Sequence, residues 1–200
     1  PVKNLQMFLN NIKMVENFNI VMENIKFKHL IYISSDAVYK DSDKKITEES
    51  CAQPDSIHGL MHISRELILK QLNMDNYCIV RPTLIFGKND PHNGYGPNSF
   101  KRIASKNNVL KLFGKGEELR DHIHVEDVAS IIETIISKCS CGIINAVTGK
   151  PLTFNYIANL CVKHINDKLK IKFTKRKTPM PHNGKRIFNN NNLKKLYLNF

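Results

Sequence analysis

The sequence has no tryptophan, only nine glycines and no apolar run long enough to cross a membrane. A bilayer-spanning helix needs about 20 consecutive apolar residues, so the composition excludes that class of protein. The first 25 residues mix Lys, Asn, Gln and Glu with apolar residues. We therefore expect no signal peptide in this stretch.

Cysteine is also scarce: the five cysteines are odd in number and show no paired framework. This pattern excludes a disulfide scaffold and favours a reduced, cytoplasmic compartment. Cys139 and Cys141 are close in sequence, but no second pair stands at zinc spacing. We therefore expect no metal site.

Acidic residues are too few to balance the basic ones, which leaves a formal net charge of +12. Most lysines are spread along the chain, and the one concentration lies in residues 168–177. There Lys168, Lys170 and Lys172 alternate with apolar residues, as on the solvent-facing side of a strand. An anion-binding surface is the alternative interpretation of the same pattern.

Residues 29–82 show the clearest organisation in the chain. The apolar runs at 30–33 and 77–81 are typical of buried strands, and the spacing of Leu60, Ile63 and Leu67 predicts a helix over 59–73. Strand, helix and strand at this spacing form a βαβ unit with parallel strands. Ligands of such sheets bind beyond the carboxyl ends of the strands, where Ser35 and Arg81-Pro82 would lie.

The motifs in this stretch resemble those of the extended short-chain dehydrogenase/reductases, specifically the NAD(P)-dependent sugar-nucleotide epimerases and dehydratases. Ser34-Ser35-Asp36-Ala37-Val38-Tyr39 matches the family's Ser-bearing strand end, with Ser35 four residues before Tyr39. The family then has Tyr-Gly-x-x-Lys followed by a Glu. Here the same frame reads His58-Gly59-Leu60-Met61-His62 and reaches Glu66, so histidine replaces both signature residues.

The resemblance implies the roles of these residues. In the family, the Tyr removes a proton from a sugar hydroxyl while hydride passes to the nicotinamide, the Lys holds the cofactor ribose, and the Ser positions the hydroxyl. Imidazole has a pKa of about 6.5 and can take a proton near neutral pH more readily than a phenol with a pKa of about 10. The implied catalytic residues are Ser35, His58 and His62, and the implied contacts to NAD or NADP are Ser34, His58, His62, Arg81 and Pro82.

A second resemblance covers residues 114–129. Gly114-Lys115-Gly116 precedes Arg120-Asp121-His122-Ile123-His124-Val125-Glu126-Asp127-Val128-Ala129, as in the family's Gly-x-Gly turn and Arg-Asp-x-Ile-x-Val-x-Asp-Val-Ala motif. A guanidinium offers a fork of donors suited to a diphosphate. The resemblance implies that Asn98, Arg120 and Arg186 contact the nucleotide-sugar, whereas we interpret Asp121 and Asp127 as structural.

The expected fold is α/β: the C-terminal part of a Rossmann-like doubly wound parallel sheet with a smaller mixed substrate-binding subdomain. Residues 1–91 form the remaining Rossmann-like part, and 92–200 form the subdomain, with about 119–146 returning to the sheet. A dinucleotide fold also needs a Gly-rich turn between its first strand and helix. Neither Gly94-Tyr95-Gly96 nor Gly114-Lys115-Gly116 has the third glycine, so we expect that this chain is the C-terminal part of a longer one.

Further elements follow from periodicity and turn residues. A helix is expected over 3–25, with an apolar stripe from Leu5 to Val15, and turn-rich loops over 40–57 and 83–100. The core should include Leu30, Ile31, Ile33, Ile63, Leu67, Ile79, Val80, Ile131 and Ile135.

Three interpretations of function remain open. The first is an NAD(P)-dependent enzyme acting on a nucleotide-sugar, which the family would assemble as a homodimer through helices 3–25 and 59–73. The second is a catalytically inactive scaffold that serves as an RNA-binding or regulatory module, favoured by the lost Tyr and Lys and by the basic charge. The third, weakest idea is that His58 and His62 form half of a zinc site.

Overall fold

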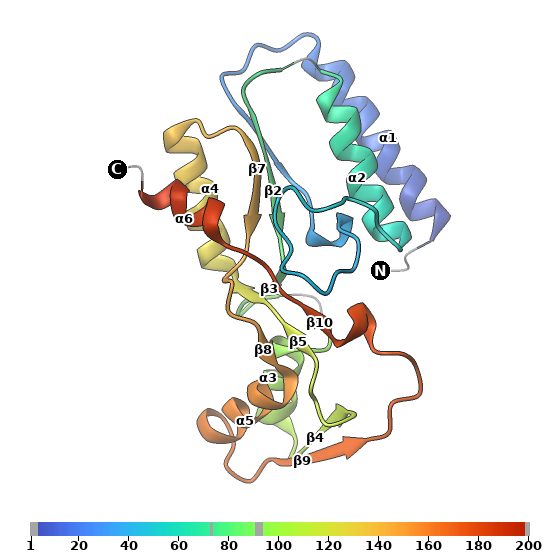
Figure 1. Cartoon of the computed structure of the whole chain (residues 1–200), viewed down its shortest axis with the longest axis vertical. Coiled ribbons are helices and arrows are strands. Elements are labelled where there is room, and N and C mark those ends of the chain that lie inside the picture. The colour runs from blue at the N-terminus through green and yellow to red at the C-terminus, as the bar shows by residue number, and fades with distance from the viewer. Residues whose placement is uncertain (1–3, 73, 91–93, 199–200) are drawn as a thin grey trace.

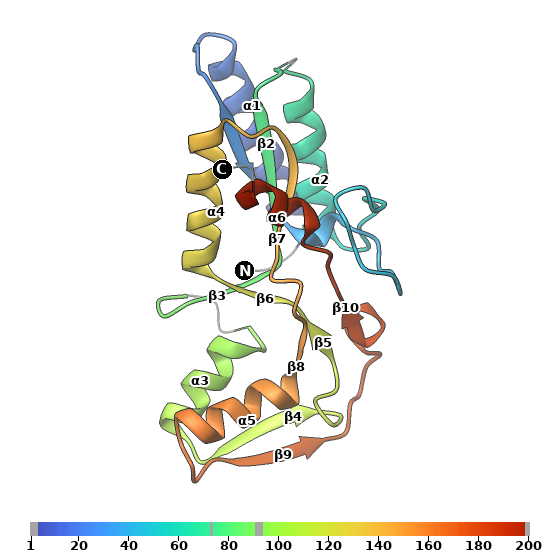
Figure 2. The same cartoon turned by 60° about the vertical axis from the view of Figure 1, so that its left-hand side comes forward.

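The computed structural model describes residues 4–72, 74–90 and 94–198 and shows two lobes stacked along the longest axis of the molecule (Figures 1 and 2). Residue 3, residue 73 and residues 91–93 lie outside this part. They include the expected first residue of one helix, the expected last residue of another and the expected boundary at 91/92. The helix limits were nevertheless wrong, because α1 spans Leu5–Met22 with Asn4 as its N-cap and α2 spans Ile57–Lys70 with Gln71 as its C-cap. The boundary at 91/92 stays a prediction.

The first lobe contains a three-stranded parallel sheet in the order β1 (Leu30–Ile33), β2 (Tyr77–Pro82), β7 (Gly142–Ala146). The helices α1 (Leu5–Met22) and α2 (Ile57–Lys70) cover one face. On the other face lie α4 (Val125–Lys138) and α6 (Asn191–Leu198), as Figure 1 shows. Parallel strands with helices on both faces confirm the expected α/β class.

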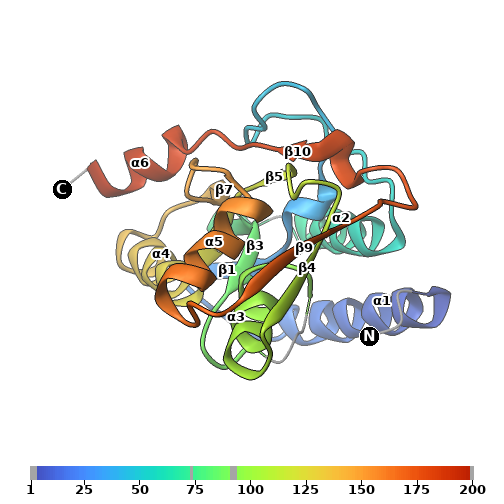
Figure 3. The same ribbon diagram turned by 90° about the horizontal axis from the view of Figure 1, so that it is seen from below.

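The second lobe is built from α3 (Pro97–Lys106), α5 (Phe154–His164) and the parallel pair β4 (Val109–Phe113) and β9 (Lys170–Thr174). Residues of β4 alternate between buried and exposed positions, as on a strand with one packed face. The packed face meets the two helices in a core that includes Phe100, Leu110, Leu112, Phe154 and Leu169. Figure 3 shows the β4–β9 ribbon seen from this end of the molecule.

Short strands connect the lobes. β3 (Leu84–Phe86) pairs with β6 (His122–His124), while β10 (Lys185–Arg186) and β8 (Leu152–Thr153) flank β5 (Leu119–Arg120). The expectation of a loop over 83–100 was therefore wrong in part, because β3 lies within it. Strands of two or three residues are too short to show an alternating pattern.

The last helix also returns to the first lobe. Leu193 and Leu196 of α6 are buried in the same core as Val80 and Ile144 of the sheet. After residue 92, the chain therefore packs against the sheet not only through residues 119–146 but also through α6.

Burial confirms Ile79, Val80, Ile131 and Ile135 as core residues. Leu30, Ile31 and Ile63 are only half-buried. The expectation was wrong for Ile33 and Leu67, which are 40% and 53% exposed. Ile33 ends an edge strand, and Leu67 faces outward because α2 turns His62 and Glu66 toward the sheet instead.

The expected apolar stripe on α1 is covered only in part. Val15 is buried, but Leu5 and Leu9 lie on the surface together with Leu60 and Leu67 of α2. The two helices pack against each other and leave apolar side chains uncovered on their outer sides. No helix of the described residues is long and apolar enough to cross a membrane.

Candidate functional site

A cavity of about 1650 Å³ opens between the two lobes. It exceeds the several hundred Å³ of an ordinary small-molecule site, and it is large enough for an extended ligand. The structure brings nearly all the expected site residues to its wall: Ser34, Ser35, His58, His62, Pro82, Asn98, Arg120 and Arg186.

The turn after β1 and the start of α2 hold the serine and histidine side of the cavity together. Ser35 Oγ accepts a hydrogen bond from the Ala37 amide at 3.2 Å and so caps the short helix η1 (Asp36–Val38). Gly59 lies against this turn so closely that a Cβ built on it would be 2.1 Å from the Ala37 carbonyl oxygen. The absence of a side chain at Gly59 therefore lets α2 begin beside Ser35.

His58 and His62 meet on the cavity side of α2. Their rings lie edge to face with centroids 4.8 Å apart, as expected for residues one turn apart. Burial, together with the smaller effects of the neighbouring His58 and Arg65, lowers the pKa of His62 to about 3. His62 is therefore a neutral imidazole near pH 7.

Arg81 does not line the cavity as a cofactor contact. Its Nε and Nη2 donate to the two carboxylate oxygens of Glu66 at 3.0 and 2.5 Å, and Ser34 Oγ donates to the same carboxylate. Glu66 is 0% and Arg81 2% exposed. The sequence interpretation is corrected on this point: the Arg81 side chain ties β2 to α2, because a buried carboxylate requires a charged partner.

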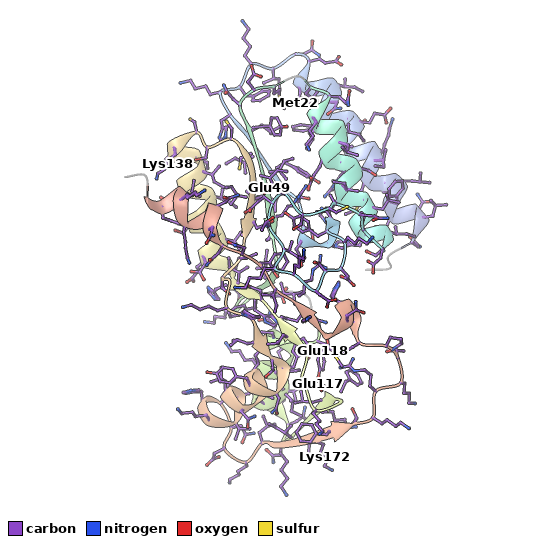
Figure 4. The ribbon with its side chains drawn as sticks, in the orientation of Figure 1. Met22, Glu49, Glu117, Glu118, Lys138 and Lys172 are labelled. Atoms are coloured by element: carbon purple, nitrogen blue, oxygen red, sulfur yellow. The ribbon has the colours of Figure 1, made fainter. Side chains whose placement is uncertain are left out.

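Arg120 and Arg186 line the cavity, and both are partly neutralised by acids. Arg120 pairs with Glu118 at 2.7 Å and donates to the Pro181 carbonyl. Figure 4 shows Glu118 where the lobes meet, far from Lys172 in the middle of β9. Burial lowers the pKa of Arg120, as expected for a desolvated cation.

Arg186 joins three segments. Its Nε donates to Asp36 at 2.9 Å and its Nη1 to Asp41 at 2.8 Å. These bonds connect β10 to the turn that carries Ser35. Asn98, near the start of α3, accepts a bond from the Gly87 amide at 3.3 Å and donates to Asp90.

Asp121 accepts bonds from the Thr148 amide and hydroxyl and from the Gly149 amide. It therefore closes the turn after β7, which confirms its structural interpretation. Asp127 lies exposed in the first turn of α4, where an acidic side chain is favoured.

Two further histidines reach the cavity without having been singled out in the sequence. His122 is buried, neither of its ring nitrogens has a partner in the described part of the chain, and burial lowers its pKa to about 4. His182 lies 2.6 Å from Asp41 in a left-handed backbone conformation. His122 begins a strand of only three residues, too short to show a pattern, so its burial carried no sequence signal.

Within the described ranges, no group of three His, Cys, Asp or Glu side chains is arranged to hold an ion. The five cysteines are all unpaired.

The parallel sheet with helices on both faces, the serine turn and the cavity between the lobes define an α/β fold with a ligand site beyond the ends of its strands. A family comparison identifies the class of protein. Residues 2–146 match the model of the NAD dependent epimerase/dehydratase family. The chain belongs to that family.

Individual relatives are distant. A trifunctional UDP-glucose 4,6-dehydratase/UDP-4-keto-6-deoxy-D-glucose 3,5-epimerase/UDP-4-keto-L-rhamnose-reductase of Arabidopsis thaliana is 27% identical over 187 residues, which cover 86% of this chain and 27% of the relative. This chain therefore spans only about a quarter of that curated relative.

Solved structures show the same fold. A UDP-N-acetylglucosamine 4-epimerase from Methanobrevibacter ruminantium M1, in complex with UDP-N-acetylmuramic acid, has a TM-score of 0.83 at 24% identity and matches 96% of this chain and 64% of its own. A UDP-glucuronic acid 4-epimerase from Bacillus cereus, in complex with UDP-glucuronic acid and NAD, has a TM-score of 0.80 at 16% identity, with coverages of 93% and 60%.

Proposed function

We propose that this protein carries out NAD(P)-dependent epimerase or dehydratase chemistry on a nucleotide-sugar, with His58 as the acid/base. The observation that supports this most directly is the His58–His62 pair on the wall of the cavity that Ser35 also lines. Family membership supplies the class of reaction.

His58 would take the proton from a sugar hydroxyl that Ser35 holds in place. An imidazole changes protonation near neutral pH, so His58 can perform this step without the lysine that a phenol requires. His62, neutral and nearly buried, would donate a hydrogen bond rather than a charge.

The residues present fit the nicotinamide-ribose end of the cofactor. The His62 ring lines the cavity, and among the described residues its Nε2 has no hydrogen-bond partner, so it can donate to a ribose hydroxyl. A bound nicotinamide would supply the electron acceptor for oxidation of the sugar. Ser34 and Pro82 line the same side.

The diphosphate of the nucleotide-sugar would lie against the second lobe. Arg120 and Arg186 line the cavity although each is only 4% exposed, and Asn98 adds an amide near the start of α3. Guanidinium forks suit phosphate oxygens, and the partial pairing of both arginines with acids would pre-organise them.

The first prediction tests the acid/base directly. His58→Phe should abolish turnover by the full protein, supplied with NAD or NADP and a panel of nucleotide-sugars, without changing its circular dichroism spectrum. His58→Tyr should lose most of the activity near neutral pH and recover it only as the pH rises, because a phenol has a pKa of about 10 and position 62 holds no lysine to lower it. Full activity of His58→Phe would assign the proton transfer to another group.

The alternative is an inactive member of the family that binds RNA or regulates a partner. It is favoured by the net charge of +12 and by the exposed lysines Lys168, Lys170 and Lys172. If the wild-type protein turns over no nucleotide-sugar at any pH, this alternative predicts RNA binding that weakens steeply between low and moderate salt. Absence of RNA binding at low salt would remove it.

We also propose that α1 and α2 pair with the same helices of a second copy. Leu5, Leu9, Leu60 and Leu67 are exposed on these helices, and burying such apolar side chains stabilises association. Light scattering of the wild type and of Leu67→Glu would test this.

The unpaired cysteines support a reducing, cytoplasmic location.

A further inference from the structure

Arg65 lies on α2 one turn beyond His62, on the side away from the cavity. Its Nη2 is 3.3 Å from His62 Nδ1. The guanidinium is held from two other elements: Nη1 donates to Asn11 Oδ1 of α1 at 2.8 Å, and the group stacks on the ring of Tyr32 of β1, 5.4 Å from its centroid. Its position beside the imidazole is therefore fixed by tertiary contacts.

This contact determines which nitrogen of His62 carries the proton. A guanidinium has only N–H donors and stays protonated, so His62 Nδ1 must accept with its lone pair. A proton on Nδ1 would face the N–H of Arg65. Because burial keeps the ring neutral, its one proton must be on Nε2.

We propose that Arg65 is a positioning residue that fixes His62 in the Nε2–H tautomer and so directs a hydrogen-bond donor into the cavity. This inference rests on the proposed function, in which His62 faces the cofactor ribose. A lysine at position 62 would combine a donor and a positive charge in one group. Here His62 provides the donor, and Arg65 provides the charge directly behind it.

A different account is that Arg65 only holds α2 to α1 and β1. The two accounts differ in what happens to the His62 ring. A purely structural Arg65 leaves the tautomer unspecified, whereas the proposed role requires loss of the donor to change it. The tautomer can be measured without cofactor or substrate, so the outcome does not depend on whether the protein is an active enzyme.

The experiment is nitrogen NMR of the full protein labelled with ¹⁵N-histidine at neutral pH, with the His62 signals assigned by their loss in His62→Phe. In the wild type, Nδ1 should resonate as an unprotonated nitrogen and Nε2 as a protonated one. Arg65→Met should give a mixture of tautomers and a raised His62 pKa. Arg65→Gln, which keeps a donor without the charge, should retain the Nε2–H tautomer.

Asn11→Ala is the matched control, because it removes the Arg65–Asn11 bond but keeps the guanidinium and its contact with the Tyr32 ring, which still holds it beside His62. It should lower stability without altering the His62 signals. A wild-type His62 protonated on Nδ1, or an Arg65→Met protein with an unchanged tautomer, would overturn the proposal. If Arg65→Met fails to fold, the wild-type and Arg65→Gln spectra still decide it.

Discussion

The two walls of the cavity are built on different physical principles. The α2–β1–β2 wall buries charge: Glu66, Arg81 and Ser34 form one bonded group behind the histidines. The opposite wall buries aromatic rings: Phe154 packs edge to face with Tyr95 at 4.7 Å and near Phe100 at 6.0 Å.

This difference determines which substitutions each wall tolerates. The hydrogen bonds of a buried charge pair are directional and need both residues, so removing one residue leaves the other buried and unpaired. An aromatic cluster depends mainly on volume and shape. The wall that carries the proposed chemistry is thus the one in which positions of atoms are most strictly held.

The largest expected effect is on the charged wall. Glu66→Ala leaves Arg81 unpaired in the interior and should lower the free energy of unfolding by about 3–5 kcal/mol. Urea denaturation followed by circular dichroism would measure it. Glu66→Gln keeps the size and part of the bonding, so it should cost less than Glu66→Ala. A loss below about 1 kcal/mol for the alanine variant would mean that the pair behaves as a solvated one.

The second effect is pH-dependent and belongs to the aromatic wall. The pKa of His122 is about 4 in the folded protein and about 6.5 when unfolded. The unfolded chain therefore binds more protons between these values, and stability falls as the pH drops from 6.5 toward 4.

His122→Phe should remove part of this loss of stability at low pH, on the order of 1–3 kcal/mol between pH 7 and pH 4. His62 should continue to contribute its own loss of stability over the same range. Thermal unfolding across this pH range would measure it. His164→Gln, which replaces an exposed histidine on α5, is the matched surface control. An identical pH dependence of His122→Phe and the wild type would contradict the prediction.

The smallest effect sharpens the contrast between the walls. Phe154→Leu should cost only about 1–1.5 kcal/mol, since the apolar cluster can repack around a similar volume. Arg81→Met, also a change to a flexible apolar residue, should cost several times more because it leaves Glu66 charged and buried. Equal losses in the two variants would show that the walls do not differ in the proposed way.

The sequence was sufficient for the parts of the fold that depend on local pattern. The apolar runs at Leu30–Ile33 and Tyr77–Pro82 and the helix between them lie close to their expected positions. Most of the site residues that the family motifs identified line one cavity, although the roles of these residues stay proposals.

The orientation of α2 could not be obtained in this way. Its apolar residues Leu60 and Leu67 predicted an inward stripe, yet His62 and Glu66 face inward. The reason is tertiary: Glu66 pairs with Arg81, 15 residues later and on another element, and this pair outweighs the helical periodicity. The same limit applies to His122, whose burial depends on α5 and the segment before α3.

Gly59 has a consequence for which kinds of sequence change the site can accept. Any Cβ at this position would meet the Ala37 carbonyl at 2.1 Å and Pro54 at 2.5 Å, so even alanine would displace α2 from the serine turn. His58, by contrast, is half-buried at the cavity and its side chain can be exchanged without moving the backbone. The residue at the position of the proposed acid/base can therefore vary while the approach of α2 to the serine turn cannot, because Gly59, which has no side chain, determines that approach.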